Sequence, residues 1–565
     1  MTFDTFPTAF LFFAAAFVLL ALPGRMRPLL LVGLPALAAW QVWNMPMGNH
    51  LQVNLMGLDL ELMRVDKLSR IFGLIFALMA FLGNIYAWHV RDPIQQVAAL
   101  VYAGAAIGAV FAGDLISLFI YWEGTAIASV FFIWARGTVG AFHTGMRYLI
   151  VQVGSGVLLI AGAALFWRET GSLDFTLMEL GSPATWLIFL AFGIKAAFPL
   201  LHNWLQDAYP AATVTGSVIL SAFTTKLAIY ALARGFAGTE ILIYIGAIMT
   251  VFPLFFSEIE NDMRRVLAYS LNNQLGFMVV GIGIGTEMAL NGAVSHAFAH
   301  ILYKALLFMG MGAVLFRTGT IKATELGGLY RTMPLTTILT TVGAVSISAF
   351  PFFSGFVTKS LTLAAAGEAQ LWLVWGALVF ASVGVLSDTG IKIPYFTFFA
   401  HDSGKRPAEA PRAMLIAMGL TAALCILIGV APNLLYALLP YEVEGSVYTA
   451  THVVGQLQLL LFAMLAFALS MRFGLHPGEN RATILDTDWA YRRAAPAILG
   501  VVAMMVQGVW GAGVAAFETL RTTAMNSIRA RSGPEGRLAH VWPTGSMVQW
   551  LAIILGVMLV AVYLA

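Results

Sequence analysis

Long apolar stretches recur along the whole chain and constrain its fold more than any other feature of the sequence. Each is long enough to cross the hydrocarbon core of a bilayer, which takes about 20 residues of helix. Of the 565 residues, 60% are hydrophobic and only 10% are charged, unlike the composition of soluble globular domains. The sequence therefore predicts an all-α, polytopic membrane bundle with no stretch left over for a soluble domain.

The apolar runs predict about fifteen membrane spans, followed by a tail that brings the total to about 15–17 helices. The predicted spans cover residues 5–23, 28–43, 68–88, 94–113, 115–135, 146–167, 184–204, 213–234, 239–259, 266–285, 289–316, 335–363, 371–400, 412–438 and 453–472. The first run follows Asp4 rather than a basic segment and lacks a small-residue cleavage site. We therefore expect it to be a retained helix.

Basic residues are distributed unevenly over the loops between these spans. If consecutive spans alternate in direction, one set of loops collects most of the arginines and lysines, while the other holds only Arg64, Lys67, Arg168 and Arg234. The positive-inside rule assigns the basic set to the cytoplasm. We expect a multi-pass protein of the bacterial inner (plasma) membrane with its N-terminus outside.

The tail does not follow this charge pattern. Residues 494–516 are apolar enough to span, but they lead into arginines that would then lie on the outer face: Arg521, Arg529, Arg531 and Arg537. We therefore predict a lateral helix on the cytoplasmic surface, with 518–531 on its polar side, and a last span near 546–565. A further span at 494–516 is the alternative.

Two similar tripeptides interrupt long apolar runs at corresponding places. Ala197-Phe198-Pro199 and Ala349-Phe350-Pro351 each contain a proline, which releases the carbonyl four residues earlier, that of Lys195 or of Ile347. Freed backbone within a membrane persists only where it faces protein or a wet cavity, and paired broken helices in repeated halves indicate a transport site. Ordinary proline kinks are the alternative.

These breaks suggest four parts of the chain. We predict peripheral N-terminal helices in 1–93, a first five-helix repeat in 94–235 that lets protons in, an inverted second repeat in 239–400 that lets them out, and C-terminal helices in 401–565. Each repeat is expected to contain one broken helix.

Four ionisable residues lie well inside apolar runs, namely Glu123, Lys195, Lys226 and Lys359. A charge at mid-bilayer costs about 2.5–3.5 kcal/mol, so four such residues need roughly 10–14 kcal/mol of compensation from pairing, hydration or neutralisation. Function on an ion pathway is one explanation. Snorkelling or structural ion pairing is the other, and it applies best to Lys359.

A second set of ionisable residues follows helical spacing. His296, His300 and Lys304 recur every four residues and are expected to share one helix face over about 12 Å, where imidazoles can relay protons. Two hydrogen-bonded core histidines are the alternative, and a zinc site is disfavoured because no suitable glutamate or cysteine accompanies them. Asp388 and Lys392 are spaced as an i,i+4 pair, either structural or serving the second repeat.

Six motifs together resemble a known family. They are VDKLSRIFGLI, LFIYWEG, IKAAFPLLHNWLQDAYP, NDMRRVLAYSLNNQLGFM, HAFAHILYKALLF and the GFVTK run, between about residues 65 and 400. The chain resembles the antiporter-like subunits of respiratory complex I, energy-converting hydrogenases and Mrp-type Na⁺/H⁺ antiporters, most closely the Mrp D subunit. The resemblance implies roles for Glu123 on the fifth helix, Lys195 and Lys359 on the broken helices, Lys226 on the eighth and the His296 set on the eleventh.

One motif departs from the family pattern. Many members carry PTPVSALLH where this chain has ATVTGSVIL, so the prolines are absent and Leu220 occupies the histidine position. Lys226 must then link the two halves alone.

The resulting hypothesis is a proton path controlled by one carboxylate. A proton from the cytoplasm would reach Lys195, pass Lys226 and His300 to Lys359 and leave outside, while movement of Glu123 loads and releases Lys195. Exchange for Na⁺, redox drive through partner subunits, a haem-binding redox subunit, and a non-transporting anchor of an inorganic-carbon uptake pair are the alternatives. We expect membrane-subunit partners and the lipid bilayer, but no redox centre, metal, cofactor or nucleic acid.

Overall fold

The protein is a helical membrane protein with two structural units. The computed structural model describes residues 5–55, 57–475 and 484–564, and these fall into a unit of Met1–Ile484 and a unit of Leu485–Ala565. Among the described residues, twelve helical stretches are long and apolar enough to cross a membrane. The predicted multi-pass membrane fold is confirmed.

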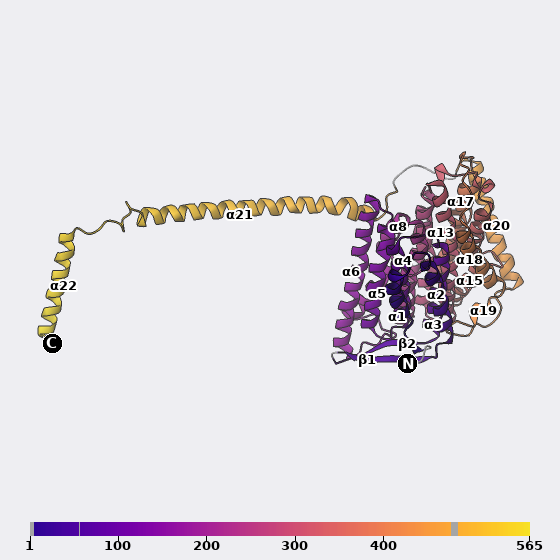
Figure 1. Cartoon of the computed structure of the whole chain (residues 1–565), viewed down its shortest axis with the longest axis horizontal. Helices are drawn as coiled ribbons and strands as arrows, with labels where there is room; N and C mark the ends of the chain where they lie inside the picture. The colour runs from indigo at the N-terminus through magenta and orange to yellow at the C-terminus, as the bar shows by residue number, and fades with distance from the viewer. Residues whose placement is uncertain (1–4, 56, 476–483, 565) are drawn as a thin grey trace. The chain divides into compact units, whose positions relative to one another are not determined.

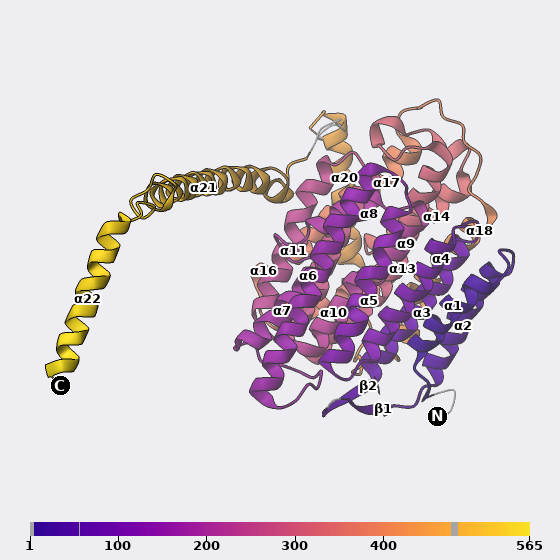
Figure 2. The same cartoon turned by 60° about the vertical axis from the view of Figure 1, so that its left-hand side comes forward.

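The first unit is a bundle of roughly parallel helices (Figures 1 and 2). Every predicted span corresponds to one helix or to a few consecutive helical segments, and in 371–400 the residues Leu386–Ile391 and Tyr395–Phe399 are π-helical. The described α-helices of this unit are α1 (Thr8–Ala21), α2 (Arg27–Asn44), α3 (Lys67–Tyr86), α4 (Pro93–Phe111), α5 (Leu115–Trp134), α6 (Val139–Thr170), α7 (Pro183–Lys195), α8 (Asn203–Ala211), α9 (Val214–Leu220), α10 (Thr224–Gly235), α11 (Ile241–Ile259), α12 (Met263–Ile284), α13 (Glu287–Thr318), α14 (Pro334–Ile347), α15 (Ser354–Glu368), α16 (Trp372–Val385), α17 (Lys392–Pro394), α18 (Arg412–Val430), α19 (Asn433–Tyr436) and α20 (Ala450–Arg472).

A short β-hairpin closes one end of the bundle, which we call the hairpin end. Strands β1 (Gly48–Leu55) and β2 (Leu58–Val65) pair antiparallel, and the carbonyl of Glu61 accepts a hydrogen bond from the amide of Gly113 beside α4. These strands were not expected from the sequence pattern. In Figure 1 the hairpin and α19 lie at this end, while α8 and α17 lie at the opposite end.

Helix α13 forms the centre of the bundle. Its side chains are buried along most of its length, and it packs against α12, α14, α15 and α18. The periphery instead exposes large apolar side chains, such as Phe17, Ile120 and Ile150. An apolar exterior around a partly polar centre suits contact with lipid rather than with water.

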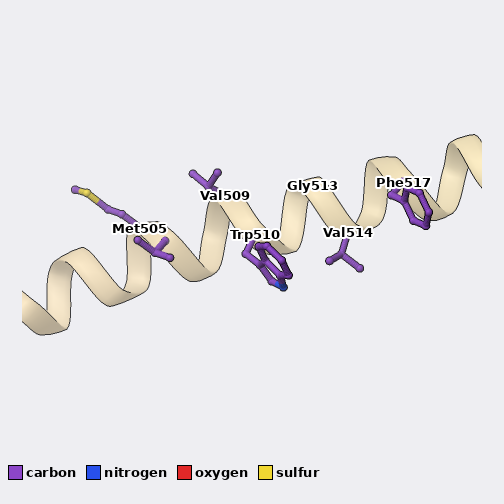
Figure 3. Close-up of a pocket in the computed structure, with 7 residues that line it drawn as sticks. Met505, Val509, Trp510, Gly513, Val514 and Phe517 are labelled. Carbon is purple, nitrogen blue, oxygen red and sulfur yellow. The ribbon is translucent and has the colours of Figure 1, made fainter.

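The second unit contains one long, continuous helix. Helix α21 (Ala495–Ser532) has 38 residues, corresponding to about 57 Å, and is followed by α22 (Thr544–Leu564). Met505, Val509, Gly513, Val514 and Phe517 are among the residues that form an open apolar surface along α21 (Figure 3). All the residues of that surface come from one helix, so it does not enclose a site. The predicted lateral placement of this helix stays a prediction.

Candidate functional site

Two helix breaks carry the same backbone geometry. Between α7 and α8, Ala197 and Leu200 have positive φ angles of 61° and 70°, and between α14 and α15, Ala349 and Phe352 have 59° and 70°. Non-glycine residues rarely adopt this left-handed conformation, and such strain clusters at functional sites. The two predicted breaks are confirmed and match residue by residue, while the inversion of the repeats stays a prediction.

The hydrogen bonds at the two breaks also match. The amides of Phe198 and Phe350 each donate to a carbonyl five residues earlier, those of Gly193 at 3.0 Å and Val345 at 3.4 Å. A proline follows each phenylalanine and has no N–H to donate, so the helix cannot continue in the usual register. The chain thus stops and restarts in the same way at two places in the bundle.

Lys359 uses the carbonyl that the second break releases. Its ammonium donates to the carbonyl of Ile347 at 2.7 Å, and its side chain is almost completely buried. This is the carbonyl that the position of Pro351 was expected to free. Snorkelling to the surface, the alternative for Lys359, does not fit a side chain held inward at the break.

Lys226 is held in a similar way at a break that the sequence did not reveal. Residues 221–223 separate α9 from α10, and the Lys226 ammonium donates to the carbonyl of Ser221 at 2.7 Å. Its side chain is fully buried. The segment contains no proline, so the only available signal was the run of small and hydroxyl residues around Ser221.

Lys195 lies at the C-terminal end of α7 against α5. Its ammonium donates to the carbonyl of Trp122 at 2.6 Å and to the hydroxyl of Thr125 at 3.1 Å, and it lies 4.3 Å from the centre of a Trp122 ring. The indole of Trp122 donates to Ser155 at 3.0 Å, and Ser155 donates to the carbonyl of Ala191 at 2.7 Å. These bonds link α5, α6 and α7 around one fully buried ammonium.

Glu123 is near Lys195 without touching it. The described contacts contain no hydrogen bond or ion pair between the two side chains, although they interact electrostatically. The Glu123 carboxylate lies against Gly156 of α6, where an added Cβ would overlap Oε1. Oε1 has no hydrogen-bond partner among the described residues. The carboxylate thus occupies a niche that only glycine leaves open.

His296, His300 and Lys304 share one face of α13, as predicted from their spacing. The rings of His296 and His300 have centroids 6.1 Å apart, and all three side chains are fully buried. His296 Nδ1 lies 3.1 Å from the hydroxyl of Thr358, the residue before Lys359. Lys304 donates to Ser270 at 3.0 Å. The histidine ladder therefore reaches the first turns of α15.

Neither ring nitrogen of His300 has a hydrogen-bond partner within the described part of the chain. His300 interacts electrostatically with Lys226 and Lys304, and these cationic groups repel one another. Buried like charges this close cannot all be protonated together without a large cost. A proton on one of these three groups therefore disfavours protonation of the other two.

Tyr303 is a functional candidate that the sequence analysis missed. Its hydroxyl donates to Gln274 at 3.2 Å and lies 3.4 Å from His296 Nε2, while its ring meets that of His300 edge to face at 5.2 Å. Gln274 continues the network by donating to Asn273 at 2.5 Å. The signal was present in HAFAHILYK, because Tyr303 lies three residues after His300 on the same face.

Asp388 and Lys392 do not form the expected i,i+4 pair. Asp388 accepts a short hydrogen bond from Ser257, whereas Lys392 donates to the carbonyls of Ser257 at 3.0 Å, Glu258 at 2.6 Å and Glu260 at 2.9 Å. Residues Leu386–Ile391 are π-helical, so positions four apart no longer lie above one another. Glu258, which accepts from Ser387 at 3.2 Å, is a neighbour that the sequence did not indicate.

The described hydrogen bonds do not join the buried lysines and histidines into one continuous chain. No described hydrogen bond joins Lys195 to Lys226, although both side chains are fully buried. The Leu220 position between them contributes only its carbonyl, which accepts from Tyr209 at 2.7 Å. Transfer between the halves would therefore need water or side-chain movement.

Comparisons with known proteins agree with the fold and the motifs. Residues 112–384 match the family model described as NADH:quinone oxidoreductase/Mrp antiporter, TM. Hydrogenase-4 component B of Escherichia coli (strain K12) is 27% identical over 423 residues, covering 66% of this chain and 63% of that protein. The D subunit of the Na⁺/H⁺ antiporter of Alkalihalophilus pseudofirmus is 30% identical over 300 residues, covering 50% of this chain and 60% of that protein. The matches thus span less than two thirds of these relatives.

Solved structures show the same fold at low sequence identity. The structure of an Mrp complex from Dietzia sp. aligns with a TM-score of 0.71 at 20% identity, covering 78% of this chain and 96% of the matched chain. The membrane-bound sulfane sulfur reductase, an archaeal respiratory membrane complex, aligns with a TM-score of 0.67 at 22% identity, covering 82% of this chain and 99% of the other. The resemblance predicted from the motifs is confirmed, since residues 112–384 match the model of the NADH:quinone oxidoreductase/Mrp antiporter family.

Proposed function

We propose that this chain is the proton-translocating, antiporter-like subunit of a multisubunit membrane complex. In this proposal the segment 94–235 takes up a proton at Lys195. Lys226 and the residues around His300 then pass the proton on, and the segment 239–400 releases it from Lys359. The end that carries the basic loops faces the cytoplasm of a bacterial inner membrane, and the N-terminus lies outside.

One observation carries the proposal. Lys195, Lys226, Lys304 and Lys359 are buried in one bundle together with His296 and His300. The ammonium groups of these four lysines rest on neutral oxygens rather than on carboxylates. A fully ion-paired cation is held in place, whereas an ammonium on a carbonyl can lose its proton at lower cost. This arrangement suits groups that gain and lose protons better than permanent structural ion pairs.

Glu123 is the proposed control group. It lies close enough to Lys195 to stabilise the charged ammonium without a direct bond, in a niche next to Gly156. Asp388 is proposed to act on the second half, because it interacts electrostatically with Lys304 and Lys359. Lys392 is the weakest member of the predicted set, since three backbone carbonyls bind its ammonium.

The test is proton flux in proteoliposomes that contain the chain purified with its native partners. A valinomycin/K⁺ diffusion potential drives protons inward, and an internal pH-sensitive dye reports them. Glu123→Gln and Lys359→Ala should each reduce the flux to the level of empty vesicles while the complex still assembles. Wild-type flux in either variant would overturn the proposal.

The same vesicles address the driving force. The relatives include subunits named for Na⁺/H⁺ antiport and for NAD(P)H-quinone oxidoreductase, so we propose that other membrane subunits complete the complex. Flux that depends on Na⁺ in the opposite compartment would indicate exchange. Flavin or iron–sulphur proteins among the co-purifying subunits would indicate redox drive instead.

A non-transporting anchor is the second candidate, and one observation favours it. Lys195 and Lys226 have no described hydrogen bond between them, and Glu123 makes no direct pair with Lys195. A wild-type complex that passes no more protons than empty vesicles, with or without Na⁺, would support the anchor.

A further inference from the structure

An open groove lies at the hairpin end of the second repeat, outside the line of residues described above. It has a volume of about 780 Å³ and is formed by α15, α16, the loop before α20 and the first turns of α20. Lys67 donates to the carbonyl of Pro440 at 3.3 Å, so that loop and the base of α3 meet at the same end. The loop and α20 follow residue 384 and are not part of the matched family module.

His452 forms the inner wall of this groove. Its ring stacks on that of Phe356 with centroids 4.6 Å apart, and its Nδ1 lies 2.8 Å from the carbonyl of Val447. Its Nε2 lies 3.3 Å from the hydroxyl of Ser360. Because a carbonyl only accepts, Nδ1 carries a hydrogen in every protonation state, and Nε2 is the nitrogen that gains or loses one.

The hydroxyl of Ser360 suits both states of His452. Ser360 donates a short hydrogen bond to the carbonyl of Phe356 and can then accept from a protonated Nε2. If Nε2 is unprotonated, the same hydroxyl can turn and donate to it, since hydroxyl hydrogens rotate to suit their partners. His452 can therefore hold or release a proton without leaving a ring nitrogen unsatisfied.

Three consecutive residues of α15 connect the interior with this groove. Thr358 meets His296 of the buried ladder, Lys359 binds the carbonyl of Ile347 in the break, and Ser360 meets His452 in the groove. The ladder, the break and the groove thus meet on one turn of α15. Glu368 and Glu444 lie exposed on the rim of the groove, where water has access.

Other contacts hold α20 and its loop on the break itself. Tyr448 accepts from the amide of Phe352 at 3.1 Å and donates to the carbonyl of Gly429, and Tyr436 donates to the carbonyl of Val357 at 2.7 Å. Phe352 and Val357 both precede Lys359, and Ser360, which meets His452, directly follows it, so these contacts lie on both sides of Lys359 only together with His452. An arrangement this specific is more than lipid-facing packing requires.

We propose that His452, with Ser360, is the proton-transfer port through which Lys359 exchanges protons with the aqueous phase at the hairpin end. This inference rests on the proposed function, because it takes Lys359 to be the last buried carrier. The proton passes between Lys359 and the imidazole through Ser360 or a water molecule, and then to water in the groove. No other reactant is needed.

The test uses the intact complex in the same proteoliposome assay. His452→Ala and His452→Gln should both lower the proton flux by at least about tenfold, because positioned proton-transfer groups typically contribute about 10²–10⁴-fold and water in the groove replaces part of that. Free imidazole, which is small enough to enter the groove, should restore flux to His452→Ala. Thr451→Ala is the matched control, since Thr451 lines the same groove, and it should keep the wild-type rate.

The outcomes separate this inference from the proposed function. Loss of flux in Lys359→Ala together with full flux in His452→Ala would overturn the port alone. Full flux in His452→Gln, or loss in His452→Ala that imidazole does not restore in an assembled complex, would show a structural histidine and also overturn it. Full flux in Lys359→Ala would instead overturn the proposed function.

Discussion

Replacing Gly156 by alanine should weaken proton transport by moving Glu123. An added Cβ at Gly156 would overlap the Oε1 of Glu123, so the carboxylate must shift by about 2 Å to reach an ordinary van der Waals separation. The change lies within α6, where alanine favours helix over glycine by about 1 kcal/mol. The folded complex should therefore assemble normally.

The size of the effect follows from the interaction of Glu123 with Lys195. We take as a worked case a charge separation that grows from about 6 Å to about 8 Å. At an effective dielectric constant of about 20 the attraction between unit charges then falls from about 2.8 kcal/mol to about 2.1 kcal/mol. The loss of about 0.7 kcal/mol changes the protonation equilibrium of Lys195 roughly threefold. We expect proton flux to fall by about the same factor.

The assay is dye-reported proton flux in proteoliposomes, with Gly154→Ala as the matched control. Gly154 lies on the same helix, and an added Cβ there meets no atom within 4 Å, so this variant should keep the wild-type rate. Asp is one methylene shorter than Glu, so Gly156→Ala combined with Glu123→Asp should be no slower than Glu123→Asp alone. Equal flux in Gly156→Ala and wild type would refute the control role of Glu123.

Three further variants test other parts of the account. Tyr303→Phe removes the hydroxyl between His296 and Gln274 and should lower flux several-fold with normal assembly, whereas an unchanged rate would remove Tyr303 from the path. Asp388→Asn should lower the proton flux at a normal yield of complex. Lys392→Met should instead lower the yield, because it leaves three carbonyls without their donor at a cost of about 1–3 kcal/mol. The reverse pattern would exchange the roles of the two residues. At the hairpin end, burial raises the pKa of Asp66, but the ion pair with Arg234 and the Ser69 amide outweigh it and lower the pKa overall. The pair therefore stabilises the fold at pH values above the unfolded pKa of Asp, about 4, and this stabilisation is lost as the pH falls below that value. Between about pH 5 and pH 3 the melting temperature of the wild-type complex should therefore drop by more than that of the Asp66→Asn complex. Parallel pH profiles would contradict this assignment.

The sequence predicted the spans and the two proline breaks well. A membrane helix must satisfy its own backbone, so an apolar run of sufficient length has few alternatives to a helix. Pro199 and Pro351 mark the breaks because a proline cannot donate within a helix. The shared face of His296, His300 and Lys304 follows directly from a spacing of four residues.

Other features depend on contacts that local patterns do not encode. The hairpin was missed because its residues lie between long apolar runs that dominated the interpretation, although LDLELMRV alternates as a strand does. The break at Ser221 has no proline, and the π-helical turn at Asp388 keeps a helical sequence pattern. The groove at His452 needs α15 and α20 to meet, which is a tertiary contact between segments far apart in the sequence.

The candidate site was predicted in composition but not in detail. The lysines, the histidines and Glu123 were all identified, and each lies within the bundle. Pairing, hydration or neutralisation was expected to compensate the buried lysines, whereas the structure places their ammonium groups on backbone carbonyls and hydroxyls. The types of residue in a sequence do not indicate which carbonyls a helix break makes available, because every residue carries a carbonyl.

Proton flux in the Lys195→Ala complex shows whether protons pass along the buried lysines. Under an imposed diffusion potential, the wild-type complex should acidify the vesicle interior, and the assembled Lys195→Ala complex should acidify it no faster than vesicles without protein. Wild-type acidification by the Lys195→Ala complex would contradict proton transfer along the buried lysines.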